Sequence, residues 1–445
     1  MNEPRRYVLV GTGSRAQMYT TALATTYREQ AQLVGLCDPN PARLAYHLHR
    51  FEEQCKGVGS TSTLLPAICA PAELGSLLKD QRADELIVTS IDRTHHTYIV
   101  AAMEAGCDVT CEKPLTIDAP RCDAILEAQR RTGRRLRVTF NYRYSPRNAT
   151  LARLLREGAI GTPLSVHFEW LLDTVHGADY FRRWHRDKRN SGGLMVHKAS
   201  HHFDLVNWWL SAYPVNVFAF GDLRFYGRDN AEARGTTRFY ERGTGHGGED
   251  PFALDLAADA DLSALYLDAE AEDGYLRDRS VFSDGISIED DMAVLARYST
   301  GTTMSYHLVA YAPWEGYRVM VNGTEGRLEL DVEERSYVSG AGDGAGRGEG
   351  STTLTLRRHW EPPKDLDVEG GDGRGHGGGD KRLLDDLFGT PGDDPLGQRA
   401  GASDGAWALL TGAAANRSFA SGLPVVPAQL LARPSLLGTA AAAMP

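Results

Sequence analysis

A short apolar run followed at once by a glycine turn constrains this chain most. Residues 7–10 (Tyr-Val-Leu-Val) predict a buried strand, and the next residues are Gly11-Thr12-Gly13-Ser14-Arg15-Ala16. Gly11 allows a tight turn, Gly13 lets the backbone approach a pyrophosphate, and Ala16 keeps the following helix close to the strand. The amides at the N-terminus of that helix would then face the phosphates. Taken alone, the pattern also fits an ordinary strand-to-helix turn.

A carboxylate at the expected spacing favours the nucleotide interpretation. Residues 32–37 predict a second buried strand that ends at Asp38, 22 positions beyond Ala16. In a dinucleotide-binding fold, an acid near this spacing binds the ribose hydroxyls of NAD and repels the 2′-phosphate of NADP. Asp38 therefore predicts NAD as the cofactor. Arg15 and Arg43 could offset the repulsion, so NADP stays open as an alternative.

Length, charge and cysteine usage narrow the class of protein. A chain of 445 residues is long enough for two domains, and its net charge of −11 argues against a nucleic-acid surface, which needs a basic stripe. There is no run of 18 apolar residues to span a membrane, and no apolar segment before the first strand to act as an export signal. The six cysteines lack a Cys-x-x-Cys spacing. We expect reduced core thiols in a cytoplasmic protein.

Two patterns divide the chain near residue 140. Residues 1–140 alternate strand and helix signals, which predicts a Rossmann doubly wound parallel sheet with helices on both faces. Residues 141–445 predict an α/β domain with an open, mostly antiparallel sheet, suited to substrate binding and to oligomerisation. A last helix is predicted over about 403–420 and a mobile glycine-rich loop over about 339–350. The segments 227–275 and 339–379 have no assigned role.

Further motifs follow in a fixed order: Val88-Thr89-Ser90, His95, Glu112-Lys113-Pro114, Ser191-Gly192-Gly193 and His201-x-x-Asp204. Together they resemble the Gfo/Idh/MocA family of nicotinamide-dependent oxidoreductases, from Val8 to about residue 330 and again at the last helix. The resemblance implies a Rossmann domain followed by an α/β domain, with NAD(H) or NADP(H) bound. It also implies sugars, cyclitols or their derivatives as substrates, and dimers or tetramers formed through the open sheet.

The run Glu112-Lys113-Pro114 follows a predicted strand, at the sheet edge where open α/β sheets bind ligands. Pro114 fixes the backbone direction, so Lys113 would project into the cleft near the nicotinamide. In a partly desolvated pocket its ammonium loses a proton more easily, and it can stabilise negative charge developing on a substrate oxygen. A surface Glu-Lys pair is the alternative. The expected cofactor contacts are Gly11, Thr12, Gly13, Ser14, Arg15, Asp38, Thr89, Ser90, His95, Glu112 and Lys113.

Residues 193–204 predict a helix start that carries His197 and His201 on one face. Such a pair can bind zinc, but no Glu follows His197 and no third ligand is evident, so no metal is expected. Histidines without a chemical role are a second interpretation. Acid–base chemistry is favoured, because an imidazole can accept a hydroxyl proton while hydride leaves the same carbon. His201 is the predicted principal base, with Lys113 as its polarising partner.

One position departs from the family pattern. Members commonly carry an Asp four residues before the catalytic His, and here His197 occupies that position. His201 loses an orienting carboxylate, while the pocket gains positive charge suited to a carboxylate, a phosphate or a developing oxyanion. His197 is therefore a catalytic candidate whose proton role stays open. Trp184 lies in an aromatic and basic run that forms either a wall for a sugar ring or a solvated loop. The expected substrate contacts are Arg143, Trp184, Lys198, His201 and His202.

The sequence thus predicts an NAD(P)-dependent oxidoreductase acting on a secondary alcohol or ketone of a sugar, cyclitol or related compound. One alternative is a glycoside hydrolase or lyase that oxidises, eliminates and reduces again, with no net redox change. A second is a dinucleotide-binding sensor, which would have no need of Lys113 and His201. The expected partners are a small sugar-like substrate and further copies of the chain.

Overall fold

The computed structural model describes residues 3–59, 64–339, 350–368, 375–390 and 392–437. The loop predicted to be mobile over 339–350 lies, apart from its two end residues, outside the described part of the chain. None of the helices in the described ranges combines the length and the apolar character that crossing a membrane requires.

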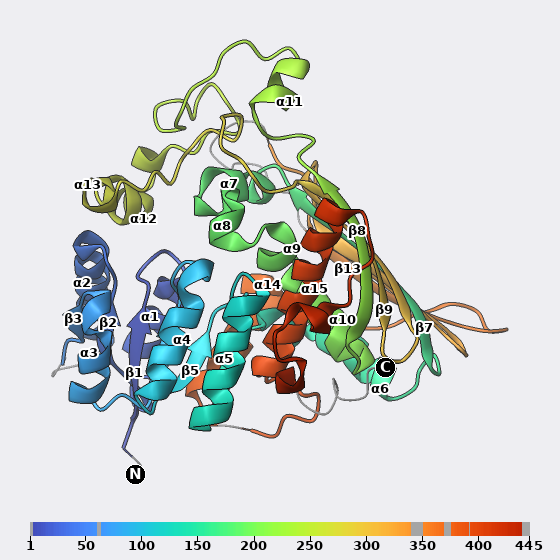
Figure 1. Cartoon of the computed structure of the whole chain (residues 1–445), viewed down its shortest axis with the longest axis horizontal. Helices are drawn as coiled ribbons and strands as arrows, with labels where there is room; N and C mark the ends of the chain where they lie inside the picture. The colour runs from blue at the N-terminus through green and yellow to red at the C-terminus, as the bar shows by residue number, and fades with distance from the viewer. Residues whose placement is uncertain (1–2, 60–63, 340–349, 369–374, 391, 438–445) are drawn as a thin grey trace.

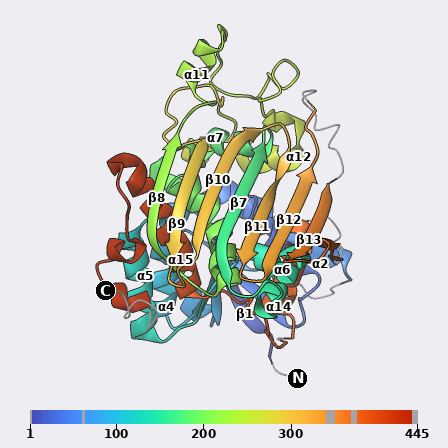
Figure 2. The ribbon, with the colours of Figure 1, turned by 90° about the vertical axis from the view of Figure 1, so that its right-hand side faces the viewer.

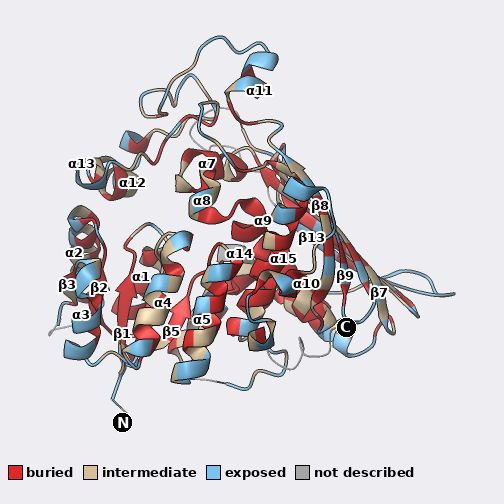
Figure 3. Ribbon diagram, in the orientation of Figure 1, coloured by how far each residue is buried: buried red, intermediate tan, exposed pale blue. Residues whose placement is uncertain are grey.

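The first domain is a six-stranded parallel sheet in the order β3-β2-β1-β4-β5-β6, which confirms the Rossmann prediction. Its strands are short apolar runs, and β1 and β5 are buried (Figure 3). A parallel sheet places the carboxyl ends of all its strands at one edge. The strands are β1 (Arg5–Val10), β2 (Ala31–Cys37), β3 (Ala67–Cys69), β4 (Glu85–Val88), β5 (Asp108–Cys111) and β6 (Leu136–Val138).

Local signals in the sequence start and stop the helices of this domain. Asn40 caps one helix by accepting hydrogen bonds from the backbone N–H groups of Ala42 and Arg43, and Pro41 stands at its first position. Gly133, with φ +67°, ends another in the left-handed conformation. The helices are α1 (Ala16–Ala24), α2 (Pro41–Gly57), α3 (Leu74–Asp80), α4 (His95–Glu104) and α5 (Ala119–Thr132).

The second domain is built on an eight-stranded sheet in the order β14-β13-β12-β11-β7-β10-β9-β8. All its neighbouring strands are antiparallel except β7 and β10, so the predicted open, mostly antiparallel sheet is confirmed. Figure 2 shows this sheet face on, with the helices behind it. Its strands are β7 (Pro163–Asp173), β8 (Pro214–Asp222), β9 (Asp291–Tyr298), β10 (Thr303–Ala312), β11 (Glu315–Gly323), β12 (Gly326–Arg335), β13 (Ser351–Arg358) and β14 (Lys364–Asp365).

Alternation along these strands separates a packed face from an open one. In β9, Met292, Val294, Ala296 and Tyr298 are buried, while the residues between them face outward. The buried face packs against helices, with α15 against both α10 and β8. The helices of this domain are α6 (Pro146–Arg156), α7 (His176–Arg182), α8 (Lys188–Ser191), α9 (Leu194–His197), α10 (Ala199–Leu210), α14 (Gly375–Phe388) and α15 (Ala402–Ser421).

The C-terminal helices α14 and α15 pack on both domains. Phe388, at the end of α14, contacts the rings of Tyr7, Tyr19 and Tyr27 in the Rossmann core. Helix α15, which the sequence predicted over 403–420, packs on α5 and β6 as well as on α10. These two helices therefore hold the domains together (Figure 1).

The segment between β8 and β9 is an insertion with little regular structure. It carries the short helices α11 (Arg228–Ala233), α12 (Ala260–Leu262) and α13 (Glu270–Asp273), a 3-10 turn over Leu256–Ala258 and a π-helical turn over Ser263–Leu267. In Figure 1 it leaves the top of the second domain and returns over α2, so that α12 and α13 lie above the Rossmann sheet edge. The polar segment that had no assigned role is thus a bridge between the domains.

Candidate active site

A cavity of about 720 Å³ opens at the carboxyl edge of the Rossmann sheet, between the two domains. Lys113, directly after β5, and His201, on α10, both line it, although they come from different domains. The cavity also reaches the glycine turn after β1. Of the predicted cofactor contacts, only Thr12 is absent from its wall, since Thr12 is fully buried beneath the turn.

The glycine turn is shaped by its neighbours. Gly11 has φ +93°, and a Cβ there would lie 2.4 Å from the backbone of Ser90, so only glycine fits. A Cβ at Gly13 would meet nothing closer than the Tyr266 hydroxyl at 3.6 Å, which leaves that side of the turn open. The Asp38 carboxylate accepts a hydrogen bond from the backbone N–H of Thr12 at 2.6 Å and lines the cavity. The turn and the acid are therefore arranged as a dinucleotide cradle.

Glu112 is fixed by partners in the Rossmann domain. It accepts hydrogen bonds from Arg15 Nε at 2.5 Å and from the Tyr19 hydroxyl at 2.8 Å. Burial opposes ionisation, but Arg15 and Tyr19 hold the pKa of Glu112 below its usual value. His95 is held too, with its ring nitrogens 2.9 and 3.0 Å from the carbonyl oxygens of Pro114 and Ser90. Both residues line the cavity and orient the segment that carries Lys113.

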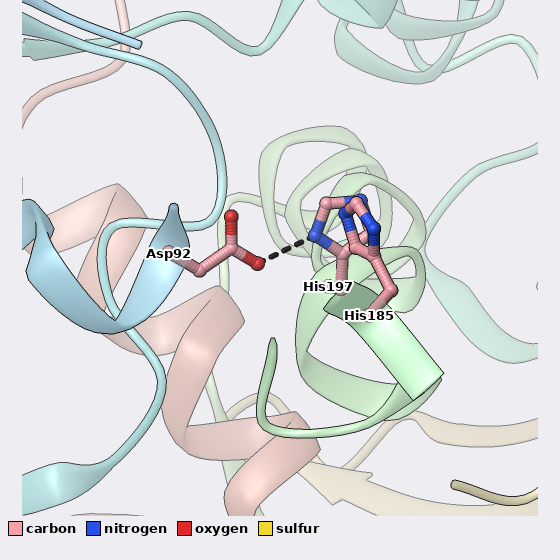
Figure 4. Close-up of side chains that lie close together, drawn as sticks. All are labelled: Asp92, His185 and His197. Carbon is pink, nitrogen blue, oxygen red and sulfur yellow. Dashed lines mark hydrogen bonds and ion pairs between the residues drawn. The ribbon is translucent and has the colours of Figure 1, made fainter. Parts of the chain in front are cut away.

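A chain of three side chains connects the two domains beside the cavity. Lys113 Nζ lies 3.2 Å from His197 Nε2, and His197 Nδ1 lies 2.6 Å from Asp92 Oδ2. Asp92 opens the turn after β4, and Figure 4 shows its carboxylate reaching across to His197 on α9. The sequence analysis named Lys113 and His197 but missed Asp92. The only signal for it was an acid shortly after Thr89 and Ser90, at the tip of a buried strand.

Burial determines the charge states of Lys113, His197 and Asp92. It lowers the pKa of Lys113 to about 7, against the opposing influence of Asp92 and Glu112. Burial and the nearby Lys113 hold the pKa of His197 well below its usual value, so the imidazole is neutral at neutral pH. Burial also raises the pKa of Asp92, while Lys113 and Arg183 act in the opposite direction. Near neutral pH, Lys113 is therefore close to its own pKa and lies beside a neutral imidazole, so it can both donate and accept a proton.

Ligand atoms of Asp92, His185 and His197 lie within 4.8 Å of one another, a grouping that could hold a metal ion (Figure 4). Both ring nitrogens of His197 are already engaged, however, one with Asp92 and one with Lys113. A cation would have to replace one of these contacts and lie next to the lysine nitrogen. The arrangement favours hydrogen bonding over metal binding.

Three of the predicted substrate contacts lie outside the cavity wall. Arg143 is buried against Asp204, with contacts of 2.6 and 2.8 Å, and against Asp404 at 2.9 Å. Lys198 Nζ lies over the ring of Trp170 at 4.6 Å, on the core side of α10. His202 stacks on the same Trp170 ring and bonds the Tyr306 hydroxyl at 2.6 Å. None of the three lines the cavity: Lys198 and His202 are turned toward the sheet, and Arg143 is turned toward α10 and α15.

The other wall of the cavity comes from α7, the turn after it and the insertion. Trp184, predicted as a substrate contact, lines the cavity and stacks on His185, with ring centroids 3.5 Å apart. Tyr266 of the insertion accepts a hydrogen bond from the Ser14 backbone N–H at 3.0 Å, directly at the glycine turn. The sequence could not assign Tyr266, since the insertion shows no periodic pattern. Tyr180 and Arg183, from the same aromatic and basic run as Trp184, also line the cavity. The wall residues that the sequence analysis missed include Asn190, Asp273, Tyr275 and Arg277.

Comparisons with known proteins agree with this geometry. Residues 5–140 match the family model described as the oxidoreductase family NAD-binding Rossmann fold, which confirms the predicted cofactor class. Residues 152–426 match the model for the C-terminal alpha/beta domain of the same oxidoreductase family. The two matches together cover most of the chain.

Individual relatives point the same way. A Bacillus subtilis protein, YteT, named as an oxidoreductase, is 34% identical over 441 residues, covering 95% of this chain and 97% of its own length. Inositol 2-dehydrogenase of Acidothermus cellulolyticus is 34% identical over 229 residues, covering 51% of this chain and 58% of its own. The fold matches aldose-aldose oxidoreductase from Caulobacter crescentus, with a TM-score of 0.60 and 16% identity over 95% of this chain and 100% of that one.

Proposed function

This chain belongs to the Gfo/Idh/MocA oxidoreductase family, and from that premise we propose that it oxidises or reduces a sugar, cyclitol or related compound at a secondary alcohol or ketone. The observation that carries the proposal is the cavity shared by the glycine turn, Lys113 and His201. Such a cavity can hold a dinucleotide and a small substrate together. We further assign NAD over NADP, because the carboxylate of Asp38 lines the cavity beside the turn.

The residues around the turn fit a dinucleotide. The open side of Gly13 suits a pyrophosphate, for which the Ser14 N–H would exchange its Tyr266 partner, and Asp38 suits ribose hydroxyls. When bound, NAD supplies or accepts the hydride. The chain's own residues bind the two molecules, exclude water and move the proton.

Lys113 is the group we assign to the substrate oxygen. In the oxidising direction its neutral amine accepts the hydroxyl proton as the hydride leaves the carbon. That proton can pass onward: one moves from Nζ to His197 Nε2 while another moves from His197 Nδ1 to Asp92. The distances of 3.2 and 2.6 Å suit both transfers. His201, which the sequence favoured as principal base, then acts as a second hydrogen-bonding group on the substrate.

The test begins with the purified protein, NAD and a panel of sugars and cyclitols. Lys113→Ala is expected to abolish turnover while NAD binding, measured by calorimetry, survives. Lys381→Ala removes an exposed lysine outside the cavity and is the control. Normal turnover in Lys113→Ala would overturn the assignment of Lys113. The pH profile of turnover in His201→Asn distinguishes Lys113 from His201 as the base. If the inflection is lost in that variant, the base that accepts the hydroxyl proton is His201.

A second candidate is redox-neutral chemistry, in which the substrate is oxidised, eliminated or hydrolysed, and reduced again. Tyr266 and the rest of the insertion cover the glycine turn, and this favours a cofactor that stays bound between turnovers. NAD retained through purification, with product formed from a glycoside and no net change in nicotinamide absorbance, would support this candidate over a net dehydrogenase.

We also propose that the chain forms a homo-oligomer through the open face of the eight-stranded sheet. Phe220 is 66% exposed on β8, and Leu295 is 59% exposed on the neighbouring β9. Phe218 packs edge-on against Phe220 and lies opposite Leu295 in the register. An outward apolar patch on an antiparallel sheet is a candidate contact between copies.

A further inference from the structure

One carboxylate behind the cavity wall is surrounded by three guanidinium groups. Asp179, on α7, lies 3.6 Å from Arg182 Nη1, 3.0 Å from Arg183 Nε and 2.8 Å from Arg277 Nη2. Although burial opposes ionisation, these arginines hold the pKa of Asp179 far below its usual value. A single negative charge therefore faces three positive charges, and the cluster carries an excess of positive charge.

Part of this excess positive charge can contact a ligand in the cavity. Arg182 points away from the cavity and donates two hydrogen bonds to the carbonyl oxygen of Phe252. Arg183 and Arg277 line the cavity instead. Arg277 is 8% exposed, and its Nη1 has no hydrogen-bond partner among the described residues. A buried guanidinium nitrogen left in this state is costly, and an anionic ligand would satisfy it.

Arg183 lies on the substrate side of the cavity, and Arg277 shares Asp179 with it while its guanidinium lies over the Tyr266 ring of the insertion at 5.7 Å. The guanidinium of Arg183 lies over the ring of Tyr180 at 5.3 Å, and that ring contacts His197 with centroids 5.5 Å apart. His197 in turn is next to Lys113. The arginines of the cofactor end are already occupied, Arg15 by Glu112 and Arg43 by Asp273.

We propose that Arg183 and Arg277, held in place by Asp179, form an anion subsite, and that the substrate is a sugar derivative carrying a carboxylate or a phosphate ester. The exposed face of the Trp184–His185 stack provides a flat surface for the sugar ring beside it. The inference rests on the proposed function, since it names the substrate class of the same cavity. It predicts that neutral sugars and cyclitols are poor ligands.

The experiment compares three ligands built on one sugar: the neutral sugar, its acid and its phosphate ester. Binding to the NAD-loaded protein is measured by calorimetry, and turnover is measured separately from nicotinamide absorbance. At least one charged ligand is expected to bind tenfold or more tightly than the neutral sugar. Arg277→Gln is expected to remove that preference while leaving binding of the neutral sugar within twofold. Arg189→Gln, an exposed arginine paired with Asp187 outside the cavity, is the matched control.

Preference for the acid identifies a carboxylate ligand, and preference for the ester identifies a phosphate ligand. Equal binding of all three ligands, or a preference that Arg277→Gln leaves intact, would overturn the anion subsite. Arg277→Lys keeps the charge and is expected to restore part of the preference, which separates the subsite from a general loss of folding. Charged-ligand binding without any turnover would keep the subsite and overturn the proposed function. Turnover of neutral sugars without charge preference would overturn the subsite and keep the proposed function.

Discussion

At the scale of single residues, the position of one carboxylate distinguishes this site. The family pattern places an acid four residues before His201, and here His197 stands there. The structure supplies an acid from the other domain, since Asp92 lies 2.6 Å from His197 Nδ1. A neutral histidine between Asp92 and Lys113 can pass a proton in either direction, because its two nitrogens are oriented toward different partners.

The pH dependence of turnover follows from this arrangement. The pKa of Lys113 is lowered to about 7, so its amine form dominates above that pH and alcohol oxidation is expected to rise as the pH passes 7. The Asp92 carboxylate raises this pKa, and Asp92→Asn is therefore expected to move the midpoint to lower pH. We expect kcat to fall about a hundredfold in that variant. A kcat–pH profile measures both effects, with Asp222→Asn on the exposed end of β8 as control; an unmoved midpoint would contradict the assignment.

Arg143 illustrates a charged residue with a structural role. It is 2% exposed and forms a bidentate pair with Asp204. Removing one partner of a buried ion pair leaves the other uncompensated and costs about 3–5 kcal/mol. Arg143→Met is expected to lower the free energy of unfolding by about that amount, measured by denaturant titration, with the substrate KM unchanged in the folded fraction. A large rise in KM without loss of stability would show instead that Arg143 contacts the substrate.

The site residues divide according to the signal that each one gives in the sequence. Lys113 and His201 stand in motifs with fixed neighbours, and both line the cavity as the sequence predicted. His202 lies one position beyond His201 on α10, and Lys198 lies one position beyond His197. A step of one residue along a helix turns the side chain by about 100°, which moves it from the cavity to the core. The roles of Asp92 and Arg277 follow from contacts between segments that are distant in the chain, and a local sequence pattern does not predict such contacts.

At the scale of elements, the insertion between β8 and β9 is attached to α2 by specific polar contacts. Asp273 accepts hydrogen bonds from Arg43 at 2.6 Å and from Asn40 Nδ2 at 3.0 Å. Asp261 accepts one from the Tyr46 hydroxyl at 2.6 Å. These contacts hold Tyr266 at the glycine turn, where its hydroxyl accepts the N–H bond of Ser14.

This attachment is expected to control cofactor exchange. Asp273→Ala removes the partner of both Arg43 and Asn40, so the insertion opens more often and NADH should enter and leave several-fold faster. Stopped-flow fluorescence of NADH measures both rates. Asp268→Ala, an exposed acid on the same segment, is the control. Unchanged rates in Asp273→Ala would show that the insertion does not limit access.

The sequence predicted the elements that have a strong period and missed those that do not. The β1 turn, the Rossmann alternation and α15 are all where the pattern indicates. Strands β12 and β13 were not predicted, although Leu328 and Leu330 alternate with polar residues in β12. The insertion is stabilised by contacts with α2 and by a small apolar cluster around Leu256, Leu265 and Tyr266, and its sequence lacks the regular period that predicts a strand or a helix.

At the scale of the whole molecule, the described helices lie behind the eight-stranded sheet and leave its outer face uncovered (Figure 2). Phe220 and Leu295 project from it, and their exposure is expected to end when a second copy binds. Phe220→Glu with Leu295→Glu should convert the oligomer to a monomer, which ultracentrifugation measures, with the circular dichroism spectrum unchanged. Leu423→Glu, an exposed leucine outside the sheet, is the control. A monomeric unmodified protein would contradict the oligomer proposal.

Helix α14 packs back on the first domain, and this packing affects folding during synthesis. Tyr7, Tyr19 and Tyr27 leave the ribosome well before Phe388, which is synthesised 361 positions after Tyr27. Until then the nascent nucleotide-binding half has an uncovered aromatic surface, which is a target for chaperones and a site of aggregation. Premature termination before residue 388 would therefore yield a polypeptide prone to precipitation and degradation, even though its glycine turn and Lys113 are already complete.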